Sequence, residues 1–278
     1  MSTQRNQVLS VKEARNFLIN YQGLNTACRY TQEKGVISYF EKVGCIQYDP
    51  LNVVGRNADL TLQSRVKGYH ADMLYKLLYQ KRTVIDAWDK MMALYLQKDW
   101  PYFKRLRASK GKEIEAVLAR RNSLQALEHL DEVREHIKKH GPSQSSSIDI
   151  GVCNPGKWGS KKLASAAMDY LFNIGELGIY SKNNVQRTYE FTEKLLKKEI
   201  LEESDPFQSD DEFYEWYVKR RIGSVGMLWA CNGGGWLGHF ISDSDIRNSK
   251  IKRLLEKGEI EEFYVCLLYT SPSPRDCS

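Results

Sequence analysis

Two helical patterns followed by two strands restrict the fold of this chain most. The first pattern ends at Gly141-Pro142 and the second at Gly175. Apolar residues recur at helical spacing in both patterns: Leu124, Leu127, Leu130 and Ile137 in the first, and Leu163, Ala167, Leu171 and Ile174 in the second. Behind them, Leu177–Tyr180 and Val185–Phe191 flank the turn-forming Asn183-Asn184 and predict a β-hairpin. The order helix, turn, helix and hairpin is typical of a winged helix.

Similar elements are predicted on both sides of this segment. At the amino-terminal side, Ser10 and Glu13 form a capping-box pattern that begins a helix ending near Gly23. A second helix, Val36–Val43, is followed by the extended piece Cys45–Tyr48. At the carboxyl side, an acidic run precedes a helix, a glycine-rich loop, a capped helix and a strand at Ile260–Val265.

The chain is therefore expected to be mainly α-helical with small β-hairpins, an α+β fold built from tandem winged-helix modules. Its 278 residues suit two domains or three small ones. The predicted modules are residues 1–115, 116–201 and 202–265, the last one incomplete. Residues 266–278 resemble a translated sequencing-adapter read-through. Pro272 and Pro274 are compatible with this interpretation, because they oppose a continued hairpin. A genuine disordered tail is the alternative.

Composition narrows the class of protein. Hydrophobic residues make up 42% of the chain, which excludes wholesale disorder, and no apolar run is long enough to cross a membrane, so a cytoplasmic protein is expected. Six scattered cysteines without a C-x-x-C pair argue against a structural zinc site, and no metal is predicted. The net charge of +6 is uneven: Lys98–Arg121 holds eight bases and three acids. Two interpretations are open for this stretch: it binds along a phosphate backbone, or it forms a helix face that is simply solvated.

The most informative residues lie between Ile46 and Val66. Gln47-x-Asp49 is followed by Arg56 and by the Leu-x-x-Arg of Leu62 to Arg65. In a winged-helix context this string resembles the signature of the YcaQ/AlkZ-like crosslink-repair DNA glycosylases. The resemblance covers Leu9 to about Val265. It implies tandem winged helices and a C-terminal β-barrel, and this chain is expected to lack the barrel.

The resemblance implies excision of N7-alkylated purines and unhooking of interstrand crosslinks by hydrolysis of the N-glycosidic bond, with no cofactor. Residues two apart in an extended piece face the same side, which would bring the Gln47 amide and the Asp49 carboxylate to one site. Asp49 would act as general base and Gln47 would position the water. The alternative is that Asp49 caps a turn and Gln47 lies on a polar face.

Arg56 and Arg65 are candidate phosphate clamps, although each could instead hold the local structure together. One departure from the family is Trp88-Asp89-Lys90, where many members have a Trp-x-His pattern. The role of that histidine is therefore not carried over to this chain, and Lys90 in its place could preserve a phosphate contact but would be a poor neutral base at pH 7.

Duplex DNA carrying alkylated or crosslinked purines is the expected partner, bound by a monomer. Further DNA contacts are predicted at the start of the second module's helix and on its wing: Lys157, Lys161, Lys162, Lys182 and Arg187. A non-enzymatic winged-helix DNA-binding regulator is the rival function, because the same fold serves many such proteins. A third outcome is that a truncated module leaves the chain unstable and inactive.

Overall fold

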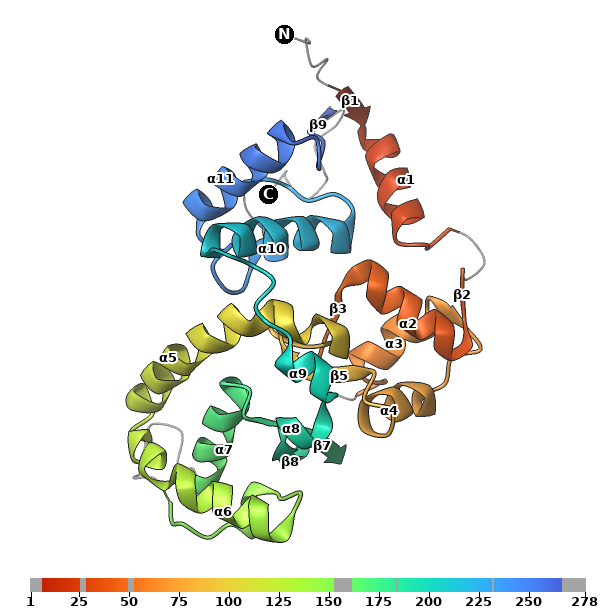
Figure 1. Cartoon of the computed structure of the whole chain (residues 1–278). Coiled ribbons are helices and arrows are strands. Elements are labelled where there is room, and N and C mark those ends of the chain that lie inside the picture. Colours follow the sequence, from red (N-terminus) through yellow and green to blue (C-terminus); the bar gives the residue numbers. More distant parts are fainter. Residues whose placement is uncertain are drawn as a thin grey trace, which may run out of the picture. The chain divides into compact units, whose positions relative to one another are not determined.

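The computed structural model describes residues 7–25, 29–49, 53–152, 162–183, 185–231 and 233–266 (Figure 1). The α-helices are α1 (Val11–Tyr21), α2 (Gln32–Val43), α3 (Asn57–Gln63), α4 (Ala71–Tyr79), α5 (Lys104–Arg120), α6 (Leu130–His140), α7 (Leu163–Asn173), α8 (Thr192–Leu195), α9 (Lys198–Glu202), α10 (Asp210–Val225) and α11 (Ser244–Glu256). The strands are β1 (Gln7–Ser10), β2 (Tyr30–Thr31), β3 (Cys45–Gln47), β4 (Val66–Lys67), β5 (Val84–Trp88), β6 (Met92–Leu96), β7 (Leu177–Asn183), β8 (Gln186–Phe191) and β9 (Phe263–Cys266). Short 3₁₀ turns are η1 (Gln97–Phe103), η2 (Leu124–His129), η3 (Ser145–Ser147) and η4 (Gly234–Trp236). The fold is thus mixed α+β, with many helices and small sheets.

The chain divides into two compact units. One is the continuous segment Tyr30–Phe213, and the other joins Met1–Arg29 to Tyr214–Ser278. The three predicted modules follow one another along the chain, whereas the second unit takes its residues from both ends. The module boundaries remain a prediction.

Local signals explain where several helices begin and end. The Ser10–Glu13 capping box is present, with each side chain bonded to the other residue's backbone, and α1 starts where the sequence predicts. Helix α2 ends at Gly44, whose φ of +77° is a conformation that favours glycine. Helix α11 is capped by Asp243, which accepts the N–H groups of Asp245 and Ile246.

Two predicted helix boundaries were wrong. Leu124, Leu127 and Leu130 are three residues apart, which matches the three residues per turn of a 3₁₀-helix, and η2 occupies this stretch before α6 begins at Leu130. The sequence also predicts a helix over Asp59–Val66, whereas helix α3 ends at Gln63 and Val66 belongs to β4, which pairs in parallel with β2.

The unit Tyr30–Phe213 contains two apolar cores. We call the first core the cluster between Val36 and Leu96, which joins α2, α3 and α4 to the antiparallel sheet β3-β6-β5. The second core is the cluster between Leu118 and Tyr189, which joins α5, α6 and α7 to the hairpin β7-β8. The predicted hairpin is confirmed, with Leu177 opposite Phe191 and Asn183 opposite Gln186.

In the other unit, β1 pairs in parallel with β9, so that Val8 lies opposite Tyr264. Tyr21 donates its hydroxyl to the carbonyl of Gly223 at 2.5 Å, which ties the end of α1 to α10. Arg247, 3% exposed, donates to carbonyls along residues 230–242 and so holds this loop against α11: Ala230, Cys231, Ile241 and Ser242. The predicted strand Ile260–Val265 is therefore present in part, and its partner is the amino-terminal strand.

Candidate functional site

The Gln47-x-Asp49 motif begins on an edge strand. In the order β3-β6-β5, β3 has one neighbour, and Gln47 lies opposite Ala93 of β6. The ladder continues one residue beyond β3, because the Tyr48 N–H donates to the Met92 carbonyl at 2.9 Å. Side chains alternate along extended chain, so Gln47 and Asp49 leave one face and Tyr48 the other. Gln47 is exposed and Asp49 is partly exposed, so both are open to solvent.

The residues after the motif return to the same strand. Pro50, Leu51 and Asn52 lie outside the described residues, and the loop that follows exposes Val53 and Val54 almost completely. The Asn57 side-chain amide donates to the Gln47 carbonyl at 3.0 Å. The start of α3 is therefore fastened to the motif strand through the backbone of Gln47, which leaves the Gln47 side chain open.

Arg56 lies beside the motif and has a local partner. Its Nε donates to Asp59 Oδ2 at 2.7 Å, and the other oxygen of Asp59 accepts the Tyr69 hydroxyl. Burial and this hydrogen bond raise the pKa of Tyr69. The Arg56 side chain remains 39% exposed, so it braces the start of α3 and still presents a cationic face to solvent.

Arg65 is held closer to the protein. Its Nη1 donates to Ser64 Oγ at 2.7 Å, and its charge acts on Tyr39, a residue of the first core. Burial raises the pKa of Tyr39, and the Arg65 guanidinium opposes that rise. The sequence left two roles open for Arg65, a phosphate contact and a local structural role, and the structure shows contacts of the second kind.

Lys182, expected to contact phosphate from the hairpin, lies instead inside the protein. Its side chain is 4% exposed and donates to the carboxylate of Asp86, whose side chain is 1% exposed. The Lys182 Nζ also lies 3.4 Å from the centroid of the Tyr48 ring. Burial lowers the pKa of Lys182, and Asp86 opposes this effect. An ammonium enclosed by these partners cannot reach a phosphate. The expected DNA contact of Lys182 is therefore replaced by a buried ion pair.

The sequence analysis also missed Asp86. It occupies the middle of β5, among residues that are otherwise apolar, and the Tyr79 hydroxyl donates to its Oδ2 at 3.4 Å. Burial and the Asp86 carboxylate raise the pKa values of Tyr48 and Tyr79. A single carboxylate inside an apolar strand was the available signal, because buried carboxylates require a partner.

The remaining predicted DNA contacts have different environments. Lys162 is exposed at the N-cap of α7, where a helix N-terminus favours phosphate. Arg187 is 34% exposed, and its Nη1 lies 3.8 Å from Asp169 Oδ1. Lys157 and Lys161 lie outside the described residues.

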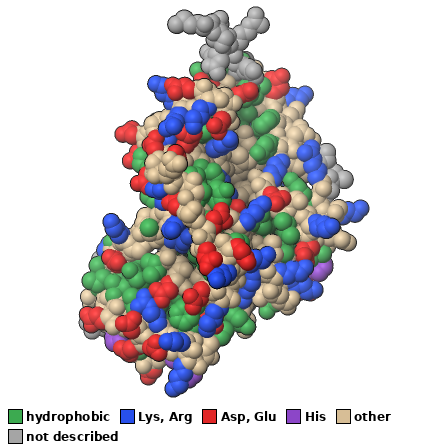
Figure 2. Space-filling model, in the orientation of Figure 1, with side chains coloured by type: hydrophobic (Ala, Val, Ile, Leu, Met, Phe, Trp, Pro, Cys, Tyr) green, Lys and Arg blue, Asp and Glu red, His purple; other side chains and the backbone are tan. Residues whose placement is uncertain are grey.

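The basic stretch Lys98–Arg121 is partly compensated within the chain. Lys98 pairs with Glu41, Arg105 pairs with two aspartates, and the buried Lys110 pairs with Glu113 at 3.0 Å. Arg107 stacks on Trp100, with Cζ 3.7 Å from the ring centroid. On the face drawn in Figure 2, basic and acidic side chains are interspersed. About half of the eight bases thus have partners in the chain, which reduces the field that this stretch offers to DNA.

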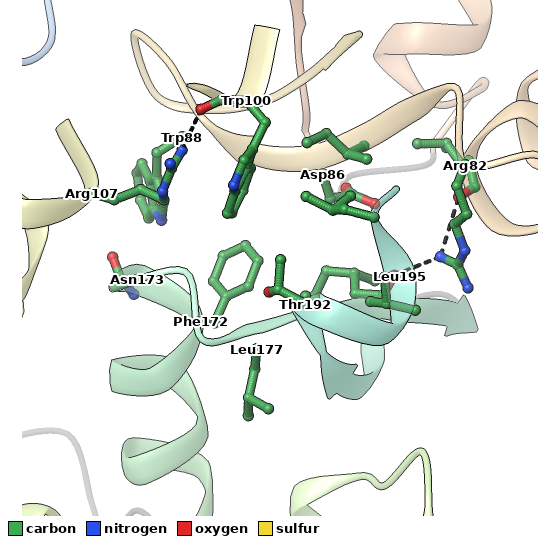
Figure 3. A pocket seen from close by; sticks show the side chains of 16 residues that line it. Arg82, Asp86, Trp88, Trp100, Arg107, Phe172, Asn173, Leu177, Thr192 and Leu195 are labelled. Atoms are coloured by element: carbon green, nitrogen blue, oxygen red, sulfur yellow. Dashed lines mark hydrogen bonds between the residues drawn. The ribbon is translucent and has the colours of Figure 1, made fainter. Parts of the chain in front are cut away.

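A small cavity separates β5 from the second core. Its volume is about 30 Å³, and Trp100, Phe172 and Thr192 point into it (Figure 3). The Thr192 hydroxyl is buried without a hydrogen-bond partner in the described part of the chain. The space suits water molecules and is far below the roughly 300 Å³ of a small-molecule pocket, so it cannot hold a nucleobase.

The described ranges contain neither a candidate metal site nor a candidate membrane-spanning helix. No group of three or more histidine, cysteine, aspartate or glutamate side chains is arranged to hold a metal ion there. None of the helices there has the length and apolar character needed to cross a membrane.

Two comparisons with known proteins identify the family of this chain. A solved structure, the DNA glycosylase AlkZ of Streptomyces sahachiroi, is similar with a TM-score of 0.55 and 12% sequence identity, over 89% of this chain and 66% of that chain. This chain therefore spans somewhat less than two thirds of that protein, and the likeness concerns the fold. The family model described as DNA glycosylase AlkZ-like matches residues 40–273, a span that includes the motif. By that match, this chain belongs to the AlkZ-like DNA glycosylase family.

Proposed function

We propose that this protein is a DNA glycosylase that removes N7-alkylated purines and unhooks interstrand crosslinks by hydrolysing the N-glycosidic bond. The observation that carries the proposal is that Gln47 is exposed at the end of strand β3 and that Asp49, two residues further on, is partly exposed, so that extended chain would direct both side chains to one face. The exposure of these two side chains leaves them accessible to a duplex, and Arg56 adds a partly exposed cation nearby. The family match supports the reaction class.

The chemistry follows from the state of the substrate. An N7-alkylated purine is cationic, so it leaves with the electron pair of the glycosidic bond and needs no prior protonation. The sugar then develops oxocarbenium character, which the Asp49 carboxylate stabilises. Asp49 accepts a proton from the attacking water as the water oxygen bonds to C1′, and the Gln47 amide orients that water. The products are a free base and an abasic site.

DNA is held by charge and by the shape of the modules. We assign the helix–hairpin segment α6, α7 and β7-β8 to a winged helix, with Lys162 at the N-terminus of α7 and Arg187 on the hairpin as backbone contacts. These contacts recognise phosphate, so they provide affinity without sequence specificity. Lys182 has no part in this surface.

The test uses duplex DNA that contains one N7-methylguanine. The wild-type chain is expected to generate alkali-labile abasic sites, and Asp49→Asn is expected to lose at least 100-fold in rate while it still binds the duplex. Asp72→Asn is the matched control, because Asp72 is an exposed aspartate of α4 in the same unit. Binding without base release by the wild type, on this duplex and on a crosslinked one, would favour the DNA-binding regulator.

A further inference from the structure

A buried ion pair, Asp86 and Lys182, lies against the ring of Tyr48, the middle residue of the motif. We infer that Asp86 and Lys182 are positioning residues that hold Gln47 and Asp49 in their reactive orientation through Tyr48. The inference rests on the proposed function, since it concerns the same site. Neither residue touches the open face of the motif; both act through the residue between Gln47 and Asp49.

The geometry makes Tyr48 the point of control. Its N–H is bonded to the Met92 carbonyl at 2.9 Å, and its ring lies 3.4 Å from the Lys182 Nζ. The backbone of Tyr48 is thus held by β6 while its side chain is held by the ammonium. Because the neighbouring side chains leave the opposite face, rotation of the strand at Tyr48 would turn Gln47 and Asp49 together.

The ion pair joins segments that are 96 residues apart in sequence. Asp86 belongs to β5 beside the first core, and Lys182 belongs to β7 beside the second. Arg82 makes a second link, donating to the carbonyls of Ile179 at 2.9 Å and Tyr180 at 2.8 Å. The hairpin is thereby fixed to the sheet that carries the motif, so the position of the hairpin is transmitted to Tyr48.

The chemistry of the pair favours a positioning role over a stabilising one. Burying two charges costs desolvation free energy that their attraction repays only in part, so a buried ion pair is weak evidence for stability. It does enforce one arrangement, because each charge excludes alternatives that would leave the other unpaired. The need to hold Gln47 and Asp49 in one orientation accounts for a buried ion pair at this place.

The experiment replaces both charges with side chains of similar shape. Asp86→Asn combined with Lys182→Met removes the pair without leaving a lone charge, and the full chain is assayed for single-turnover base release and for affinity for the duplex. We expect the rate to fall at least tenfold with affinity changed less than twofold, because small misplacements of reacting groups cost rates of this order. Arg134→Met with Glu176→Gln is the matched control, a paired replacement in the same unit away from the motif.

Tyr48 provides an independent arm. Tyr48→Phe keeps the ring under the Lys182 ammonium and should retain the rate within about twofold, whereas Tyr48→Leu removes the cation–π contact and should lose as much as the double variant. Hydrogen exchange at the Tyr48 amide should accelerate in the double variant and in Tyr48→Leu. A purely structural role would not separate rate from affinity in this way.

The possible failures are distinguishable. A wild-type rate in the double variant would overturn the positioning role, as would equal losses in the Arg134/Glu176 control. If the wild-type chain binds DNA but releases no base, the proposed function fails. In that case the hydrogen exchange of the Tyr48 amide still tests the link between the ion pair and Tyr48, and an unchanged exchange rate in the double variant would refute it.

Discussion

Replacing Lys182 alone by methionine gives the sharpest prediction for stability. The variant leaves the Asp86 carboxylate at 1% exposure with the Tyr79 hydroxyl at 3.4 Å as its remaining hydrogen-bond donor shown here. Breaking a buried ion pair by removing one partner costs about 3–5 kcal/mol, because the remaining charge stays desolvated. For a unit of this size, each kcal/mol lowers Tm by roughly 2–4 °C, so the expected fall is about 6–20 °C.

The assay must report on the correct unit, because unfolding of a two-unit chain need not be a single transition. Calorimetry gives the change in Tm, and native-state hydrogen exchange of the β5 and β6 amides gives the free energy of opening for their own unit. The double replacement Asp86→Asn/Lys182→Met should recover most of the loss, since no lone charge remains. The reasoning is refuted if Lys182→Met loses less than about 1 kcal/mol, or if the double variant is as unstable as the single one.

Three further predictions concern separate parts of the chain. Gln47→Ala should lower base release about 100-fold with the unfolding free energy changed by less than about 0.5 kcal/mol, because Gln47 is exposed; parallel loss of stability in urea unfolding would contradict this. Burial and Asp169 raise the pKa of Tyr189 to about 12, so the contribution of Tyr189 to stability is complete below pH 10 and is lost as the pH rises toward 12. In urea unfolding between these pH values, the wild type should therefore lose about 3 kcal/mol more unfolding free energy than Tyr189→Phe. The Ser10 backbone and hydroxyl lower the pKa of Glu13 below 4.5, so its contribution is present above that pH and lost in more acidic solution; Glu13→Gln should remove this acid-side step from the pH dependence of the urea midpoint.

The sequence predicted best the features that are decided by neighbouring residues. The capping box at Ser10 and Glu13, the helix end at Gly44 and the hairpin after Gly175 all depend on contacts within a few residues, and the structure confirms each of them. The placement of the motif on an extended piece followed from the same kind of signal. Its catalytic role remains a proposal, because position on a strand does not establish chemistry.

What the sequence could not predict depends on distant partners. Lys182 looks like a surface lysine of a hairpin until Asp86, 96 residues earlier, is placed beside it. The pairing of β1 with β9 gives no local signal either, because parallel strands are joined through long connections. The sequence pattern also merged the 3₁₀ turn η2 with the following helix α6. Over a short stretch, residues three apart fit the period of a 3₁₀-helix and that of an α-helix equally well.

The parallel pairing of β1 with β9 has a consequence for the order of folding. Gln7 faces Phe263 across this small sheet, so this part of its unit is completed only after more than 250 intervening residues have been synthesised. The continuous unit Tyr30–Phe213 meets no such delay and can form while the ribosome is still translating the rest. During that interval α1 lacks the later residues of its own unit, and its apolar face is available to chaperones or to another nascent chain. A permuted gene that joins the two halves of the discontinuous unit in sequence would shorten this exposure.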